Sequence, residues 1–244
     1  MLRNLNRIRG YGIEARDGSI GSVRDFFLDG ANWCVRYVMV DTGQWLPGRR
    51  VLIAPAAIDH IDDERRRVSV NLMKRGVEDS PSVREHLPVS LRKEFERNLA
   101  MNWPHVMLSP AGAPILTLPP NAAGVIGDQE PHLRSLDELT GYGIEARDGS
   151  IGRAHDVIVS EEDFKVRLLV VDTNHWLPGR KVLIDPDWVE GISWADRRIV
   201  MGLSRKEIEE SPEYDESTAI DHQYVERLYA FYGRPRNWSI GTPI

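Results

Sequence analysis

The 244-residue sequence is 41% hydrophobic and 28% charged, with 31 Lys and Arg against 37 Asp and Glu and a formal net charge of −6. This composition supplies enough apolar surface to offset the entropy of ordering the chain, so it excludes disorder as the main state and allows one or two folded domains. The negative charge disfavours general nucleic-acid binding, because phosphates attract basic surfaces.

The single cysteine, Cys34, restricts the redox and metal chemistry of the chain. One thiol excludes an intramolecular disulfide and a multi-thiolate zinc site within the chain, which fits a reducing compartment. No apolar run approaches the roughly 18 residues that span a bilayer. Residues 1–10 are polar and basic and lack the apolar region of a signal peptide. We therefore expect a cytoplasmic protein without a transmembrane segment, and peripheral association with a membrane complex stays open.

The sequence contains one domain-sized segment twice. Residues 10–21 and residues 141–152 both read GYGIEARDGSIG, an offset of 131 residues (141 minus 10). The segments VDT, WLPGR and VLI, which follow the first copy, recur at the same offset after the second. An uninterrupted register indicates that both copies share one backbone plan. We predict a first domain over 1–103, a linker over 104–136 and a second domain over 137–244.

Each copy reads as short strands separated by turn signals. In the first copy the predicted strands are Ile13–Arg16, Ile20–Leu28, Val35–Val40, Val51–Ile53, Ala57–Ile61 and Val68–Leu72. The first two flank Asp17-Gly18-Ser19, a strong hairpin signal, and Pro47-Gly48 suits a type II turn. About six short strands at this spacing predict a mainly β fold of two tandem small antiparallel barrels.

An amphipathic helix is predicted to follow each barrel. In the first copy Leu91, Phe95 and Leu99 share one helical face. The linker that follows holds six prolines, which oppose both helix and central strand: Pro104, Pro110, Pro114, Pro119, Pro120 and Pro131.

The second copy carries clearer helix signals. Ser204 and Glu207 form a capping box for a short helix. A longer helix is predicted from an N-cap at Asp221 to Tyr232, and Gly233 ends it. Its apolar face contains Val225, Leu228, Tyr229 and Tyr232. Because a small barrel is marginally stable alone, we expect the tail helices to pack on the barrels and the two barrels to pair within the chain.

The GYGIEARDGSIG hairpin, the strand ending in VDT, the WLPGR turn and the VLI strand resemble the PRC-barrel domain. This domain occurs in the photosynthetic reaction centre H subunit and, more distantly, in the C-terminal half of a ribosome maturation factor. The resemblance covers both copies and extends to soluble bacterial proteins similar to the H subunit. It implies a small β-barrel that binds other proteins and has no catalytic residues. The H subunit has an N-terminal membrane helix and the ribosome factor a different N-terminal domain, so neither specific role transfers to this chain.

The carboxylates present in both copies could in principle perform acid–base chemistry. They are Glu14, Asp17, Asp25 and Asp41, with Glu145, Asp148, Asp156 and Asp172. The turn position of Asp17 and the strand-end position of Asp41 favour structural roles, because an Asp oxygen there accepts hydrogen bonds from nearby backbone N–H groups. Glu14 is expected to form a surface ion pair with Arg16 along one strand face. The seven histidines show no metal-ligand spacing, and His155 and His175 align with Arg24 and Gln44. We expect no catalytic residues, no metal and no cofactor.

The WLPGR turn is the most distinctive element of each copy. As structure, Trp45 and Trp176 would cover one end of each barrel while Pro-Gly sets the turn. As function, an aromatic residue followed by an arginine has the composition of interface hot spots. The second interpretation makes Trp45, Arg49, Trp176 and Arg180 a candidate interaction surface.

Two classes of function follow. The first is a non-enzymatic protein-interaction module or scaffold of two fused barrels whose partner is unknown. The second is an enzyme or small-ligand binder that uses a cleft between the barrels, where ligand pockets tend to form. The resemblance, the duplication and the missing catalytic motifs favour the first.

Overall fold

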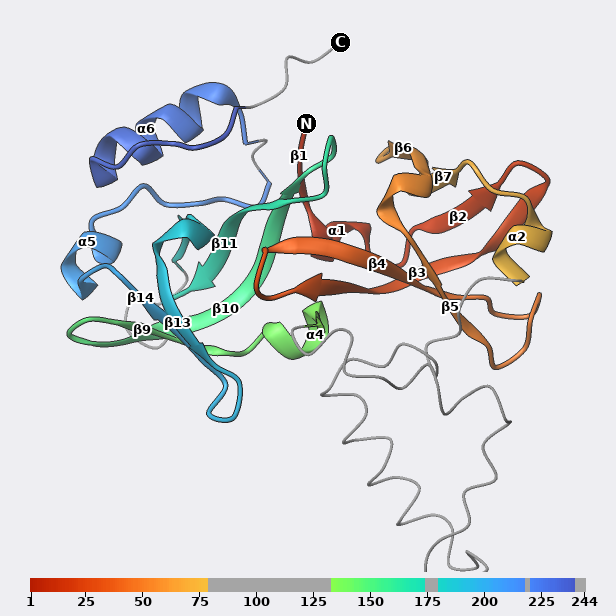
Figure 1. Cartoon of the computed structure of the whole chain (residues 1–244). Helices are drawn as coiled ribbons and strands as arrows, with labels where there is room; N and C mark the ends of the chain where they lie inside the picture. The colour runs from red at the N-terminus through yellow and green to blue at the C-terminus, as the bar shows by residue number, and fades with distance from the viewer. Residues whose placement is uncertain (79–132, 174–179, 218–219, 240–244) are drawn as a thin grey trace, which may run out of the picture. The chain divides into compact units, whose positions relative to one another are not determined.

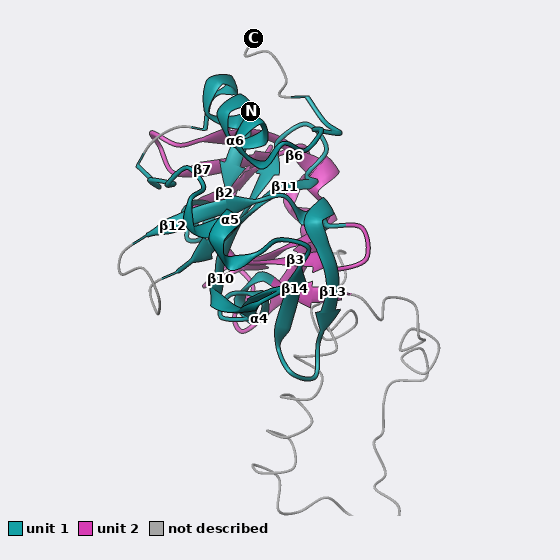
Figure 2. Ribbon diagram, turned by 90° about the vertical axis from the view of Figure 1, so that its left-hand side faces the viewer, with its two compact units in different colours: residues 1–10, 33–35, 136–244 teal, residues 11–32, 36–135 magenta. Residues whose placement is uncertain are grey.

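The computed structural model describes residues 1–78, 133–173, 180–217 and 220–239, and the chain is mainly β (Figure 1). It divides into two compact units (Figure 2). Unit 1 contains residues 1–10, 33–35 and 136–244, and unit 2 contains residues 11–32 and 36–135. Each unit is therefore assembled from both sequence repeats. The predicted tail helix at Leu91–Leu99 and nearly all of the predicted linker lie outside the described residues.

Unit 2 holds one seven-stranded sheet whose main path runs β5-β4-β3-β2-β7-β6. The strands are β2 (Gly12–Ala15), β3 (Gly18–Asp29), β4 (Cys34–Asp41), β5 (Arg50–Ile53), β6 (Ile58–Asp62) and β7 (Arg67–Val70). A 3-10 turn, η1 (Pro55–Ala57), precedes β6, and the short helix α2 (Lys74–Glu78) follows β7. Ala57 thus belongs to the turn and not to the strand predicted to start there.

Unit 1 repeats this plan with the path β12-β11-β10-β9-β14-β13. The strands are β9 (Gly143–Ala146), β10 (Gly149–Ser160), β11 (Val166–Asp172), β12 (Lys181–Ile184), β13 (Val189–Ser193) and β14 (Arg198–Met201). The helical elements are α1 (Leu5–Ile8), α4 (Leu136–Leu139), η3 (Pro186–Trp188), α5 (Arg205–Glu209) and α6 (His222–Tyr232). The common strand order confirms that the repeats share one backbone plan.

The sheets differ from the predicted antiparallel barrels in one pairing. β2 pairs with β7 in parallel, and β9 pairs with β14 in the same way, so both sheets are mixed. A parallel pair joins strands that are distant in sequence, which local turn signals do not reveal. Among the described residues the path does not close from its last strand to its first, so the structure establishes two sheets and leaves barrel closure as a prediction.

The seventh strand of each sheet comes from the other repeat. β1 (Leu2–Asn4) pairs with β10 of the second repeat, with Leu2 opposite Ser160. β8 (Leu133–Ser135) pairs with β3 of the first repeat, with Leu133 opposite Asp29. Both pairings are antiparallel. Replacing each residue of the β1–β10 pairs by its counterpart in the other repeat gives the β8–β3 pairs, so the two registers are equivalent. The two repeats therefore exchange their leading strands.

A repeated glycine explains part of the GYGIEARDGSIG motif. The hairpin predicted at Asp17-Gly18 forms between β2 and β3, and Gly18 adopts a φ of +127° that L-residues avoid. The last glycine of the motif is Gly21 on β3 and its counterpart Gly152 on β10. An added Cβ on Gly152 would overlap the backbone oxygen of Asp172, and one on Gly21 would overlap that of Asp41. This position therefore requires glycine because two backbone segments approach closely there.

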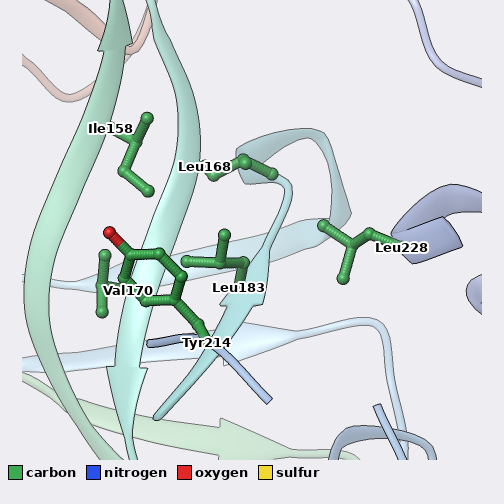
Figure 3. Close-up of a cluster of buried hydrophobic side chains, with 6 residues drawn as sticks. All are labelled: Ile158, Leu168, Val170, Leu183, Tyr214 and Leu228. Carbon is green, nitrogen blue, oxygen red and sulfur yellow. The ribbon is translucent and has the colours of Figure 1, made fainter. Parts of the chain in front are cut away.

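The core of unit 1 extends from the sheet to the C-terminal helix. Ile158, Leu168, Val170 and Leu183 of β10–β12 form a buried cluster with Tyr214 and Leu228 (Figure 3). Helix α6 begins after Asp221, whose side chain accepts a hydrogen bond from the Tyr224 N–H at 2.7 Å, and it ends at Gly233 with a φ of +60°. These bounds confirm the predicted helix, and the buried Leu228 confirms its apolar face.

Candidate functional site

The WLPGR turn of the first repeat is fixed by backbone and side-chain hydrogen bonds. The Arg49 N–H donates to the Leu46 carbonyl at 3.0 Å, and Gly48 has a φ of +74°, as the predicted type II turn requires. The Thr42 hydroxyl lies 2.7 Å from the carbonyl oxygen of Leu46 and 2.8 Å from that of Arg49. The VDT and WLPGR segments thus form one hydrogen-bonded loop between β4 and β5.

Helix α2 and the β2–β3 hairpin lie beside this loop. The Asp17 carboxylate accepts a hydrogen bond from the Lys74 N–H at 2.8 Å, which joins the hairpin to the start of α2. The Lys74 ammonium lies 5.7 Å from the ring centroid of half-buried Trp45, within cation–π range. We call Asp17, Trp45, Arg49 and Lys74 the turn end of unit 2.

Both arginines of the candidate interaction surface donate to the backbone at the end of a short helix. Arg49 Nη2 lies 2.6 Å from the Glu78 carbonyl oxygen, at the last residue of α2. Arg180 Nη2 donates to the Ser211 carbonyl oxygen, just after α5. Both arginines are half-buried, and each hydrogen bond reaches the segment that follows β7 or β14. Trp176 lies outside the described residues.

The repeated carboxylates have structural partners. Asp148 accepts from the Arg205 N–H at 2.7 Å, as Asp17 does from Lys74 in unit 2. Glu145 forms an ion pair with Arg198 at 2.9 Å, and Glu14 pairs with Arg67 in the same way. Asp41 accepts from the Gly43 N–H at 3.0 Å. These contacts support the structural interpretation of Asp17, Asp41, Asp148 and the two glutamates.

Asp156 is buried and only 2% exposed, as is its counterpart Asp25 of the first repeat at 4%. The Asp156 oxygens accept from the Asn6 N–H at 3.1 and 3.2 Å and from the Val157 N–H at 2.7 Å. Burial raises the pKa of Asp156 to about 7, although these hydrogen bonds and Arg9 act in the opposite direction. The sequence places Asp156 on a strand but gives no sign that Asn6, 150 residues earlier, lies against it.

A second polar cluster lies at the edge strand β12. His155 Nε2 and Lys181 Nζ are 2.9 and 2.8 Å from Glu216 Oε1, and they lie 2.9 Å from each other. Burial acts to raise the pKa of Glu216, but Lys181 and His155 outweigh it and the pKa is lowered. The matching positions of the first repeat hold Arg24 and Arg50. The cluster anchors the segment after α5 to β12.

An aromatic cluster specific to the second repeat holds the C-terminal segment. The Tyr229 hydroxyl donates to the buried Asp185 carboxylate, and Trp238 Nε1 lies 2.9 Å from the Tyr229 oxygen and 3.3 Å from Asp185 Oδ2. Burial raises the pKa of Asp185 in spite of these donors. The position that matches Asp185 in the first repeat is Ala54, so the repeat itself gives no signal for this cluster.

The described residues contain neither a cluster of metal ligands nor a helix that could span a membrane. Within them, no group of three or more His, Cys, Asp or Glu side chains is arranged to hold a metal ion. No helix in this part of the chain is long and apolar enough to cross a membrane. Comparison of the sequence with models of protein families and with curated proteins finds no match.

Proposed function

We propose that this protein is a non-enzymatic interaction module of two strand-exchanged PRC-type barrels that binds a protein partner. The observation that carries the proposal is the turn end of unit 2, where Trp45 and Arg49 of a hydrogen-bonded loop lie beside helix α2 and its Lys74. In support of the barrel type, the hairpin, VDT, WLPGR and VLI segments occupy consecutive strands and turns from β2 to β5.

The turn end suits protein recognition for two physical reasons. Trp45 is half-buried, so its indole offers apolar area together with an N–H donor, and Lys74 adds positive charge over the ring while Arg49 adds a second charge on the same loop. Tryptophan and arginine are enriched among residues that dominate binding energy. The hydrogen bonds of Thr42 and Arg49 hold the loop in one conformation, which lowers the entropy lost when a partner binds.

The remaining parts of the proposal follow from the sequence and from the structural roles of the carboxylates. Asp17, Asp148 and Asp156 accept backbone hydrogen bonds that hold the fold together. A binding role uses no cofactor and no metal, and we place it in the cytoplasm with the two repeats paired within one chain. The net charge of −6 is consistent with a protein partner in preference to nucleic acid.

The test is capture of a partner by the full chain from its native cytoplasm, with cross-linking to identify what binds. We then expect Trp45→Ala and Arg49→Ala to weaken the affinity for that partner by at least tenfold. Arg180→Ala reports whether the second repeat contributes. Arg65→Ala is the matched control, because this arginine is 77% exposed in the β6–β7 turn.

Stability must be measured in parallel, since Arg49 also holds the end of α2. We expect Arg49→Ala to change the free energy of unfolding by no more than about 1 kcal/mol, as for a partly exposed hydrogen bond. If the Arg49 and Trp45 variants fold normally and bind the partner like wild type, the turn end is not the binding surface. Turnover of a substrate by the purified chain would contradict the proposal itself.

A further inference from the structure

The N-terminal segment docks over a buried carboxyl group. Residues 1–10 belong to unit 1, where β1 pairs with the end of β10 and α1 follows directly. Asp156 lies on β10 two residues before Ile158, the partner of Asn4. Its carboxylate accepts the backbone N–H of Asn6, and the Asn6 side chain donates to the His155 carbonyl at 3.0 Å. Docking of this segment therefore depends on contacts with an ionisable group.

Charged and titratable groups approach Asp156 from several elements. Arg9 comes from the docked segment and also forms an ion pair with Asp137 of α4 at 3.2 Å. His155 is the neighbouring residue on β10, and both His155 and Lys181 of β12 form ion pairs with Glu216. The Tyr214 hydroxyl is close enough for Asn4 to hydrogen-bond to it and for Glu216, Asp156 and Arg7 to act on it. Arg9 favours the ionised carboxylate and Glu216 opposes it.

We propose that Asp156 is a proton-linked latch for the N-terminal segment. With the segment docked, the carboxyl group is buried and its ionisation shifts toward the neutral form, because a buried carboxylate has lost its hydration. When Met1–Gly10 leaves, water reaches the group and the ionised form becomes the stable one. Proton uptake at Asp156 therefore tightens docking, and proton loss releases the segment and uncovers the Ile158–Ser160 edge of β10.

The direction and range of the effect follow from linkage. In the docked state the pKa of Asp156 is about 7, and in the released state it returns toward the ordinary value of about 4. Because its pKa is higher in the docked state, Asp156 makes its full contribution to docking at pH values below the released-state pKa. That contribution decreases as the pH rises and is lost above the docked-state pKa. The opening equilibrium should thus increase by up to about tenfold per pH unit between roughly pH 4 and 7 and level off above.

Hydrogen–deuterium exchange of the full chain tests the latch. We would follow peptide 1–10 by mass spectrometry and the Asn6 amide by NMR at pH 5, 6, 7 and 8, and convert the rates to protection factors so that intrinsic exchange cancels. We expect protection in wild type to fall by roughly ten- to a hundred-fold from pH 5 to pH 7 and to change little from pH 7 to pH 8. A protection factor that does not change with pH would overturn the proposal.

Three variants assign the titrating group. Asp156→Asn keeps a hydrogen-bond acceptor and removes the titration, so the pH dependence should disappear. Asp25→Asn makes the same change at the matching buried position of unit 2 and should leave it intact. His155→Gln should also leave it intact. Persistence of the pH dependence in Asp156→Asn, or its loss in His155→Gln, would contradict the latch, and the wild-type curve remains a test if a variant fails to fold.

Discussion

Arg3 Nε lies 2.7 Å from Glu161 Oε1, which ties the leading strand of the first repeat to the sheet of the second repeat. The Arg3 side chain is 13% exposed and the Glu161 side chain 26% exposed, so water screens the pair only partly. The position that matches Glu161 in the first repeat is Gly30. The ion pair therefore favours docking of β1 on β10 over docking of β1 on the sheet of its own repeat.

Charge reversal tests this preference. Arg3→Glu and Glu161→Arg should each lower the free energy of unfolding by about 1 kcal/mol or more, because each places like charges together at a partly buried site. The double variant restores opposite charges and should recover most of the loss, measured by urea denaturation as a double-mutant cycle. Additive losses in the double variant would show that the pair does not contribute.

A glycine substitution tests the close approach in β10. Gly152→Ala should destabilise the chain by roughly 3 kcal/mol or more, because the added methyl group overlaps the backbone of Asp172 and only a backbone shift relieves it. Gly191→Ala is the control in the same unit, since no atom lies within 4 Å of its added Cβ. The melting temperatures of both variants check this, and equal losses would contradict it.

Strand exchange predicts that the repeats stay together after the chain is cut between them. A specific protease site inserted after Pro120 should yield two fragments that co-elute in size-exclusion chromatography, because β1 completes the second fragment and β8 the first. Denaturant should separate the fragments, which provides their reference positions. Fragments that separate without denaturant and remain folded would contradict the exchange.

The Tyr229 hydroxyl should matter more than that of a neighbouring tyrosine on the same helix. Tyr229→Phe removes a donor from buried Asp185 and an acceptor from Trp238, which should cost about 1–3 kcal/mol. Among the described residues, the contacts of the Tyr224 hydroxyl are long, 3.4 Å to the Pro212 oxygen and 3.3 Å to that of Glu213. Tyr224→Phe should therefore cost less than about 0.5 kcal/mol in the same denaturation experiment.

Features encoded by neighbouring residues could be predicted from the sequence, and contacts between distant residues could not. Helix α6 followed from the Asp221 cap and Gly233, and the first hairpin from Asp17-Gly18, since each signal acts within a few residues. The three residues of β1 are too few to show alternation, and their partner strand lies over 150 residues away. No turn motif connects β2 with β7, so local sequence signals do not predict their parallel pairing.

The candidate site divides in the same way. The WLPGR loop was visible because it occurs twice, and its type II turn followed from Pro47-Gly48. The sequence could not show that Arg49 reaches the end of α2 or that Asp156 accepts the Asn6 amide, because both contacts depend on how the sheet is assembled. A carboxylate becomes unusual through burial, and burial depends on the whole fold.

The exchange of leading strands also constrains how such a chain can change over generations. After a gene duplication, the two halves usually become free to diverge, and either can be lost or recombined with another domain. Here a substitution in Leu2–Asn4 alters the sheet of the second half, and a substitution in Leu133–Ser135 alters the sheet of the first half. Deletion of either half removes a strand from the sheet that is left. The halves must therefore be inherited together, and each must vary in step with the other.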